Sequence, residues 1–323
     1  MVSTTFRVHA VVDAVVTVEP VDPPDPEPPD FIYGVTEPTA AGLYTPTAVT
    51  GPRVPETSMR TYDGSLTNVT EGEVIDRLII TGRFRPEAAH WTLRDSIVAG
   101  GQPPAGETLW PLLDMRDGDS EGGLIEHVEV RPTYRGYEIY GLKGGSVTAD
   151  RTLIRGVVDG VQPHGSGSYP NTTNKRVRLR GCMVDDLTVF DDPGQSDGIT
   201  HNDDVQSAGA LDLLEVYGCA LHGGRTSAIL LQQNQGLFKL VFILANWLYG
   251  DPDTGSTFNT SQNGRGVIAA DGALVVIGNR FSKAGNTPHA LISPSTLDSP
   301  SFVWRSNTYL EDGTEVVPSR GAD

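Results

Sequence analysis

Short runs of β-branched and large apolar residues recur along most of the chain, and each run ends in a pair of small or polar residues. The second members of these pairs follow one another at intervals of 24 to 37 residues. They are Ser96, His127, Arg151, Cys182, Cys219, Asn246, Asn279 and Asn307. Self-similarity with a period of about 20 to 50 residues is typical of repeat architectures. The pattern therefore predicts a repeat protein.

The units fit a parallel β-helix better than other repeat folds. None contains a long apolar pattern with a spacing of about 3.6 residues, which excludes helical repeats. Regular leucine spacing is absent, and the units are too short and uneven for four-stranded propeller blades. In a parallel β-helix each coil contributes two or three short strands, and their apolar sides stack into one long core. Glycine, asparagine and aspartate at the corners supply the turns, so we expect an all-β solenoid.

A second strand follows the corner pairs, and its outward side predicts a polar strip. Because side chains alternate along a strand, one residue of each segment should point into the core and its neighbour outward. The residues expected to point inward are Val161, Val205, Leu231 and Ile268. Their outward neighbours are Gln162, Gln206, Gln232 and Ala269, flanked by His164, Asp204 and Asn234. Stacked coil above coil, these side chains predict a glutamine ladder on one face.

The N-terminal part of the chain has a different pattern. Residues Thr5 to Glu19 alternate with strand character, and six prolines follow within the eleven residues from Pro20 to Asp30. Such a proline-rich segment forms a stiff, extended spacer. We therefore divide the chain into an extended N-terminal arm and linker at 1–30, a capping segment at 31–69 and the β-helix at 70–323.

Composition narrows the classes of function. The chain has 323 residues, with 37 glycines, 23 prolines and enough apolar residues for a large core, so a collagen-like or disordered chain is excluded. A net charge of −17 argues against binding to nucleic acid or to an anionic membrane, because both favour basic patches. The most apolar window, Leu237 to Leu248, is too short to span a membrane.

The cysteines and the N-terminus indicate the compartment of folding. Cys182 and Cys219 occupy equivalent corners of neighbouring units, and we expect both to be free thiols in the core. The first twenty residues have no basic n-region and carry Asp13 inside their apolar stretch, which disfavours a signal peptide. We therefore expect the protein to be made and folded in a cytoplasm.

Several motifs carry a resemblance to a known fold family. The corners ending in GC, GN or SN, with DGVQPHG and SDGITHNDDVQ on the following strands, resemble the right-handed parallel β-helix of the pectate-lyase-like superfamily, over about residues 70 to 310. More narrowly, the chain resembles the β-helical minor tail or tailspike proteins of phages that infect actinobacteria. That resemblance rests on the arm without a signal peptide, the proline linker, the Arg-rich and Lys-poor composition, and the His-x-Asp-x-x-Gln strand at His201, Asp203 and Gln206.

The resemblance implies a structural virion protein of a tailed phage. Residues 1–30 would anchor it to other tail proteins, and its polar face would contact glycan of the host cell wall. Spikes of this architecture are often trimers, so the resemblance also implies a homo-oligomer, with a trimer as one option. Neither binding to nucleic acid nor insertion into a membrane is expected. A host cell-surface adhesin is a further interpretation of the same coils.

Enzyme families on this fold carry motifs that are mostly missing here. Calcium-dependent pectate lyases have a Trp-x-Asp-His and an Arg-x-Pro-x-x-Arg element, and the chain has neither. Polygalacturonase-like hydrolases have an Asn-Thr-Asp, a paired Asp, a Gly-His-Gly and an Arg-x-Lys. The chain has only the paired Asp, at 191–192 and 203–204. A polysaccharide lyase or glycoside hydrolase is therefore the alternative rather than the first prediction.

The densest polar cluster extends from Asp191 to Gln206, and catalysis is one interpretation of it. Two carboxylates flanking a glycosidic bond can act as acid and as base or nucleophile. Repulsion within a cluster of aspartates raises the pKa of one member, as an acid at neutral pH requires. In this interpretation Asp203 or Asp204 is the acid, and Asp197 or Asp191 is the base.

The same cluster has simpler explanations. The Asp-Asp-Pro-Gly sequence at 191–194 is a turn signature, and Asp or Asn at corners bonds the backbone. His201 shares parity with Val205, so it would point inward as a buried histidine. Clustered oxygens also suit calcium, although no known calcium repeat is present and no cofactor is required. A glycan-binding strip without catalysis would use Gln162, His164, His201, Gln206, Gln232 and Asn234.

Overall fold

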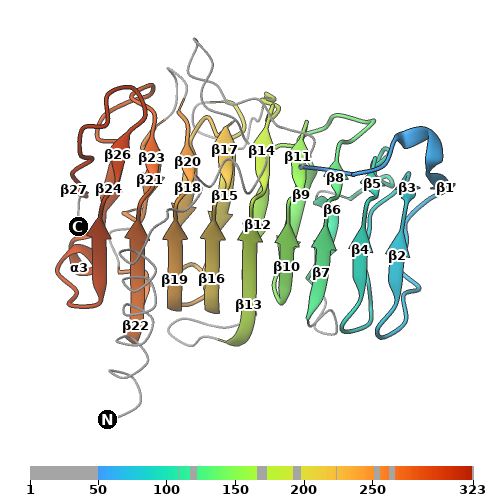
Figure 1. Ribbon diagram of the computed structural model, residues 1–323, viewed down its shortest axis with the longest axis horizontal. Helices are drawn as coiled ribbons and strands as arrows, with labels where there is room; N and C mark the ends of the chain where they lie inside the picture. Colours follow the sequence, from blue (N-terminus) through green and yellow to red (C-terminus); the bar gives the residue numbers. More distant parts are fainter. Residues whose placement is uncertain are drawn as a thin grey trace, which may run out of the picture.

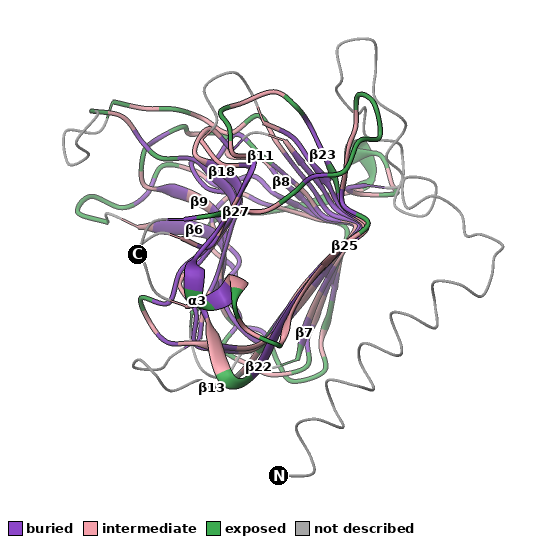
Figure 2. Ribbon diagram, turned by 90° about the vertical axis from the view of Figure 1, so that its left-hand side faces the viewer, coloured by how far each residue is buried: buried purple, intermediate pink, exposed green. Residues whose placement is uncertain are grey.

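The chain folds into a right-handed parallel β-helix, which confirms the expected fold class (Figure 1). The computed structural model describes residues 50–107, 109–116, 122–165, 173–191, 198–222, 224–250, 255–261 and 266–321. The arm and linker at 1–30 lie outside these residues. Viewed from the C-terminal end, the sheets enclose one core, with buried residues along their inner sides (Figure 2).

The strands form three sheets, of ten, nine and eight strands, in which all neighbouring strands are parallel. The ten-stranded sheet contains β1 (Arg60–Tyr62), β3 (Leu78–Ile80), β5 (Ile97–Val98), β8 (Glu129–Val130), β11 (Leu153–Arg155), β14 (Met183–Asp185), β17 (Ala220–His222), β20 (Trp247–Leu248), β23 (Arg280–Phe281) and β26 (Thr308–Tyr309). The nine-stranded sheet contains β2 (Val74–Asp76), β4 (Thr92–Arg94), β7 (Gly123–Glu126), β10 (Val147–Asp150), β13 (Thr173–Arg180), β16 (Leu211–Tyr217), β19 (Phe238–Leu244), β22 (Ile268–Ile277) and β25 (Phe302–Arg305). The eight-stranded sheet contains β6 (Trp110–Met115), β9 (Ile139–Gly144), β12 (Val161–Pro163), β15 (Asp203–Ser207), β18 (Ser227–Leu231), β21 (Phe258–Asn259), β24 (Ala290–Ile292) and β27 (Ser319–Arg320). A typical coil therefore passes through the nine-, the ten- and then the eight-stranded sheet.

The corner between the nine- and ten-stranded sheets explains the repeats in the sequence. In each coil one residue at this corner has a positive φ. These residues are Arg77, Asp95, His127, Arg151, Gly181, Gly218, Ala245, Gly278 and Ser306. Left-handed backbone costs a non-glycine residue roughly 1–2 kcal/mol. In the corner residues from Arg77 to Gly278 the backbone N–H offsets part of this cost, because it donates to a carbonyl of the next coil, as Gly181 does to Tyr217 at 2.9 Å.

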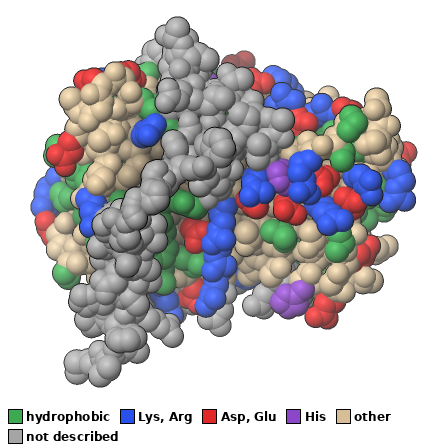
Figure 3. Space-filling model, viewed as in Figure 1, with side chains coloured by type: hydrophobic (Ala, Val, Ile, Leu, Met, Phe, Trp, Pro, Cys, Tyr) green, Lys and Arg blue, Asp and Glu red, His purple; other side chains and the backbone are tan. Residues whose placement is uncertain are grey.

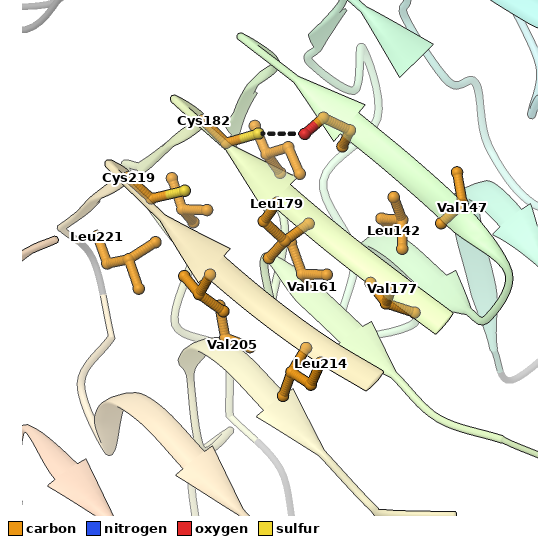
Figure 4. Packing of buried hydrophobic residues seen from close by; sticks show 14 of the residues in the cluster. Leu142, Val147, Val161, Val177, Leu179, Cys182, Val205, Leu214, Cys219 and Leu221 are labelled. Carbon is orange, nitrogen blue, oxygen red and sulfur yellow. Dashed lines mark hydrogen bonds between the residues drawn. The ribbon is translucent and has the colours of Figure 1, made fainter. Parts of the chain in front are cut away.

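Inside the same corner, equivalent side chains stack along the axis of the helix. Asn246, Asn279 and Asn307 form a ladder in which the amide of one donates to the side-chain oxygen of the next, each time at 2.9 Å. Cys182 and Cys219 continue this row toward the N-terminus as buried free thiols, as expected (Figure 4). The Cys182 thiol donates to the carbonyl of Ala149 at 3.3 Å.

Segments at both ends of the described chain pack against the coils. Residues 50–58, which include the 3-10 turn η1 (Glu56–Ser58), cross the outside of the corner near the N-terminal end (Figure 1). There Arg53 donates to both carboxylate oxygens of Asp95, at 2.9 and 2.6 Å. At the C-terminal end, helix α3 (Pro294–Leu297) and the buried Val316 cover the last coils. Within the described residues, no helix is long and apolar enough to cross a membrane.

Candidate functional site

Polar side chains form a row on the outer side of the eight-stranded sheet. The register aligns Asp114 of β6, Lys143 of β9, Gln162 of β12 and Gln206 of β15 on four successive coils. The Lys143 ammonium donates to Oε1 of Gln162, and Nε2 of Gln162 donates to Oε1 of Gln206 at 2.9 Å. The predicted alignment of Gln162 with Gln206 is therefore confirmed.

The row ends earlier than the sequence pattern predicts. Leu230, and not Gln232, pairs with Gln206. Gln232 lies just beyond β18, where it is buried and accepts a hydrogen bond from Asn234 at 3.2 Å. The inclusion of residues 268–269 in this row is also wrong, because they belong to β22 of the nine-stranded sheet. The run from Ala228 to Leu231 is apolar at every position, so alternation could not define its register.

Two aspartates lie at the start of neighbouring coils of this sheet, one coil apart. Asp159 and Asp203 each precede by two residues a valine of the pair Val161 and Val205. The backbone N–H of Asp203 donates to Oδ1 of Asp159 at 3.0 Å, and Gln162 donates to Oδ2 of Asp159 at 2.6 Å. The pair is thus connected to the polar row through Gln162. Asp159 was not predicted from the sequence, although an alignment of VVDGV at 157–161 with NDDV at 202–205 matches it to Asp203.

Burial controls the protonation of this pair. Asp159 is 4% exposed, and its desolvation raises its pKa to about 7, against hydrogen bonds from Asp203 and Gln162 that lower it. Asp203 has no exposed surface, and desolvation together with the charge of Asp159 raises its pKa well above the usual value. The nearby Ser227 offsets part of that rise. The pair therefore binds protons at pH values where ordinary carboxyl groups are ionised.

Asp204, the other proposed acid, is equally buried. Desolvation raises its pKa well above the usual value, and the backbone of Gly224 lies close enough to offset part of the rise. Neither of its carboxylate oxygens makes a hydrogen bond of ordinary geometry. Asp203 and Asp204 are adjacent in sequence, and each has no exposed surface through which it could touch a polymer in this conformation.

The remaining predicted residues are dispersed around the row. His164 is half-buried, its Nδ1 lies 3.0 Å from the carbonyl of Gly165, and burial lowers its pKa. The expectation that His201 points inward is wrong, because His201 precedes β15 and is exposed. Asn234 is exposed as well. Asp191 bridges Ile199, whereas Asp197, the proposed base, lies outside the described residues.

Lys143, within the row, and Asp114, at its N-terminal end, have different surroundings. Burial lowers the pKa of Lys143, which lies 5.4 Å from the ring centroid of Tyr140. Asp114 is held by two guanidinium groups: Arg116 donates to both of its oxygens at 2.7 Å, and Arg83 lies 3.3 Å away. Its charge is compensated, so Asp114 supports the face structurally.

Among the described residues, no group of three or more His, Cys, Asp or Glu side chains is arranged to hold a metal ion. Of the carboxylates proposed for calcium, 192 and 197 lie outside that part of the chain. No family model, no curated protein and no solved structure matches this chain. The site is therefore interpreted from its own geometry.

Proposed function

We propose that this protein is a structural virion component of a tailed phage, a minor tail or tailspike protein, and that its β-helix presents the polar row to glycan on the host surface. The observation that carries the proposal is the hydrogen-bonded row of Lys143, Gln162 and Gln206 along the axis of a rigid solenoid. Amide groups both donate and accept hydrogen bonds, which suits the hydroxyl groups of a polysaccharide. A regular row at the strand spacing of about 4.8 Å suits an extended polymer.

The accessible members of the site define where glycan would bind. Gln206 and Lys143 are half-buried, and His201 and Asn234 are exposed at the borders of the face. Gln162 is nearly buried and holds Gln206 in place by its hydrogen bond. We therefore assign Gln206 and Lys143 to glycan contact and Gln162 to positioning.

Binding to isolated actinobacterial cell-wall polysaccharide tests the glycan part of the proposal. Replacing both Gln206 and Lys143 with Ala should weaken binding about tenfold, because each lost hydrogen bond contributes about 0.5–1.5 kcal/mol. Thr92→Ala, on the outer face of the nine-stranded sheet, is the matched control and should bind like the unchanged protein. Equal affinity of all three proteins for the polysaccharide would contradict the assignment of this face.

Localisation tests the virion part of the proposal. Antibodies raised against the β-helix should label the tail of intact virions in electron micrographs. Antibodies against residues 1–30 should label only after the tail is disrupted, if that segment is held by other tail proteins. Purified virions that contain none of this protein would refute the virion assignment while leaving the glycan test standing.

A polysaccharide-degrading enzyme is the second candidate, and one observation favours it. Asp159, with a pKa of about 7, lies beside Asp203 on the next coil, so two carboxyl groups are paired where one can be protonated at neutral pH, as a glycoside hydrolase requires; the buried pair would have to become exposed to reach a substrate. Incubation of the protein with cell-wall polysaccharide should then release reducing or unsaturated ends. Asp159→Asn should abolish that release while Asp271→Asn, an exposed control, leaves it unchanged. No release of ends by the unchanged protein rules the enzyme out.

A further inference from the structure

A second polar site lies on a different face, where four coils enter the nine-stranded sheet. The strand register places His90, Gly122, Ser146 and Arg176 at one position on successive coils. The two middle residues are small, whereas the two outer residues are large and basic. This arrangement leaves a pocket of about 570 Å³ between His90 and Arg176, with Gly122 and Ser146 at its floor.

Glycine at position 122 keeps this pocket open. Its φ is +72°, and a Cβ atom at this position would lie 2.5 Å from Nδ1 of His90. A side chain there would displace the His90 ring and fill the hollow. The backbone N–H of Gly122 donates to the carbonyl of Ser146 at 3.0 Å, which fixes the floor.

The wall toward the C-terminal end is cationic. Along β13 the outward residues are Arg176, Arg178 and Arg180, and Figure 3 shows a column of Lys and Arg side chains over this strand. Two of them share Glu215: its Oε1 accepts a hydrogen bond from Arg180 at 2.6 Å, and its Oε2 lies 3.7 Å from Arg178. In a protein whose net charge is −17, Arg178 thus shares Glu215 with Arg180, and Arg176 is left without an acidic partner among the described residues.

The remaining lining groups are donors without competing acids. Thr148 lies opposite Arg178 on the neighbouring strand, and Ser146 lies two residues before Thr148, opposite Arg176. In the part of the chain that the structure describes, neither hydroxyl makes a hydrogen bond, and no carboxylate lines the pocket. Guanidinium and hydroxyl groups around a polar hollow are the donors that phosphate and carboxylate groups require.

We propose that this pocket binds an oxyanion, a phosphate or carboxylate group carried by a small molecule or a polymer, between His90 and Arg176. Arg176 and Arg178 donate to the anion, and Ser146 and Thr148 complete its hydrogen bonds. The site lies on the nine-stranded sheet and does not depend on the polar row of the eight-stranded sheet, so it stands even if the proposed glycan face is wrong.

Isothermal titration calorimetry with inorganic phosphate and with glucuronate tests the site and separates its two sources of oxyanion, and glucose serves as the neutral control. We expect saturable binding of at least one anion, weakened by added salt, and none of glucose. Arg176→Gln should weaken binding tenfold or more, because bonds to charged groups are roughly twice as strong as neutral ones. Arg180→Gln removes the same charge from the same strand outside the pocket and should change affinity less than about threefold.

A second variant tests the pocket without changing charge. Gly122→Ala should abolish anion binding, and its circular dichroism and urea unfolding show whether the coils remain folded. If phosphate and glucuronate both fail to bind the unchanged protein, the proposal is wrong. It is also wrong if Arg180→Gln weakens binding as much as Arg176→Gln, because the anion would then respond to the charge of the whole strand.

Discussion

Three aspartates near the starts of β12 and β15 are buried, whereas most carboxyl groups in proteins are exposed to solvent. Asp159, Asp203 and Asp204 all have a raised pKa, with desolvation as the largest cause. A group whose pKa is higher in the folded than in the unfolded state binds more protons when folded. The contribution of such a group to stability is therefore fully present below the unfolded-state pKa of about 4 and is lost as the pH rises through the folded-state pKa.

The pH dependence of unfolding should show this effect directly. Between pH 5 and pH 8 we expect the free energy of unfolding to fall by roughly 2 kcal/mol or more, because ionised carboxylates must be kept out of water. Ion-paired groups such as Asp312, with a pKa of about 2, stay ionised throughout this range and do not contribute. Asp204→Asn should be more stable than the unchanged protein at pH 8 and should show a smaller pH dependence in urea titrations.

An exposed aspartate provides the control for that measurement. Asp271→Asn changes the same group outside the core and should leave the pH dependence as it is. If Asp204→Asn unfolds with the same pH dependence as the unchanged protein, the buried carboxyl group does not titrate in this range.

Individual residues of the site also show which of its features could not be predicted from the sequence. The acidic cluster around Asp203 was evident from the local sequence, but the burial of Asp203 and Asp204 was not. His201 is another example. Alternation along a regular strand would place it on the same side as Val205, but β15 begins only at Asp203, so the alternation does not extend to residue 201. Asp159 was missed because it lies 44 residues before its partner, and only the coil register brings the two together.

At the scale of elements, the corners were the most predictable feature. Their left-handed residues recur because every coil must turn sharply at the same edge, so the sequence repeats where the backbone is most constrained. Two of the predicted pairs are displaced by one position: in the pairs ending at His127 and Arg151, the left-handed residue is the second member instead of the first. Strand registers were harder to predict, because loops of unequal length separate them, as the displacement of Gln232 shows.

A substitution in the asparagine ladder measures how much one corner contributes to the free energy of unfolding. Nδ2 of Asn279 donates to the carbonyl of Ile243 and to Asn307, both at 2.9 Å, and its Oδ1 accepts from the backbone N–H of Asn246 at 3.0 Å. Asn279→Ala leaves several of these buried groups unsatisfied, each at a cost of about 1–3 kcal/mol. We expect thermal unfolding to show a loss of roughly 3 kcal/mol. Asn234→Ala, at an exposed asparagine outside the ladder, should cost less than about 0.5 kcal/mol.

At the scale of the whole molecule, the coils form a one-dimensional stack in which each contacts mainly its neighbours. Stability in such a stack is approximately a sum over coils and the interfaces between them. A defect at one end should therefore loosen the adjacent coils and leave distant coils intact. The end coils matter most, because each has only one neighbouring coil to cover its core.

Trp304 of β25 is a half-buried side chain that packs against the core near the C-terminal end. Its Nε1 donates to the carbonyl of Val316 at 2.8 Å, and its ring centroid lies 6.0 Å from that of Phe258 and 5.8 Å from that of Phe281. Trp304→Ala should cost about 2–3 kcal/mol, less than the loss of about 3–5 kcal/mol for a fully buried aromatic residue, because Trp304 is half-buried. Hydrogen exchange should then accelerate in β21 to β26, while β7 to β12 keep the protection of the unchanged protein. Equal acceleration in both groups of strands would show instead that the whole solenoid unfolds as one cooperative unit.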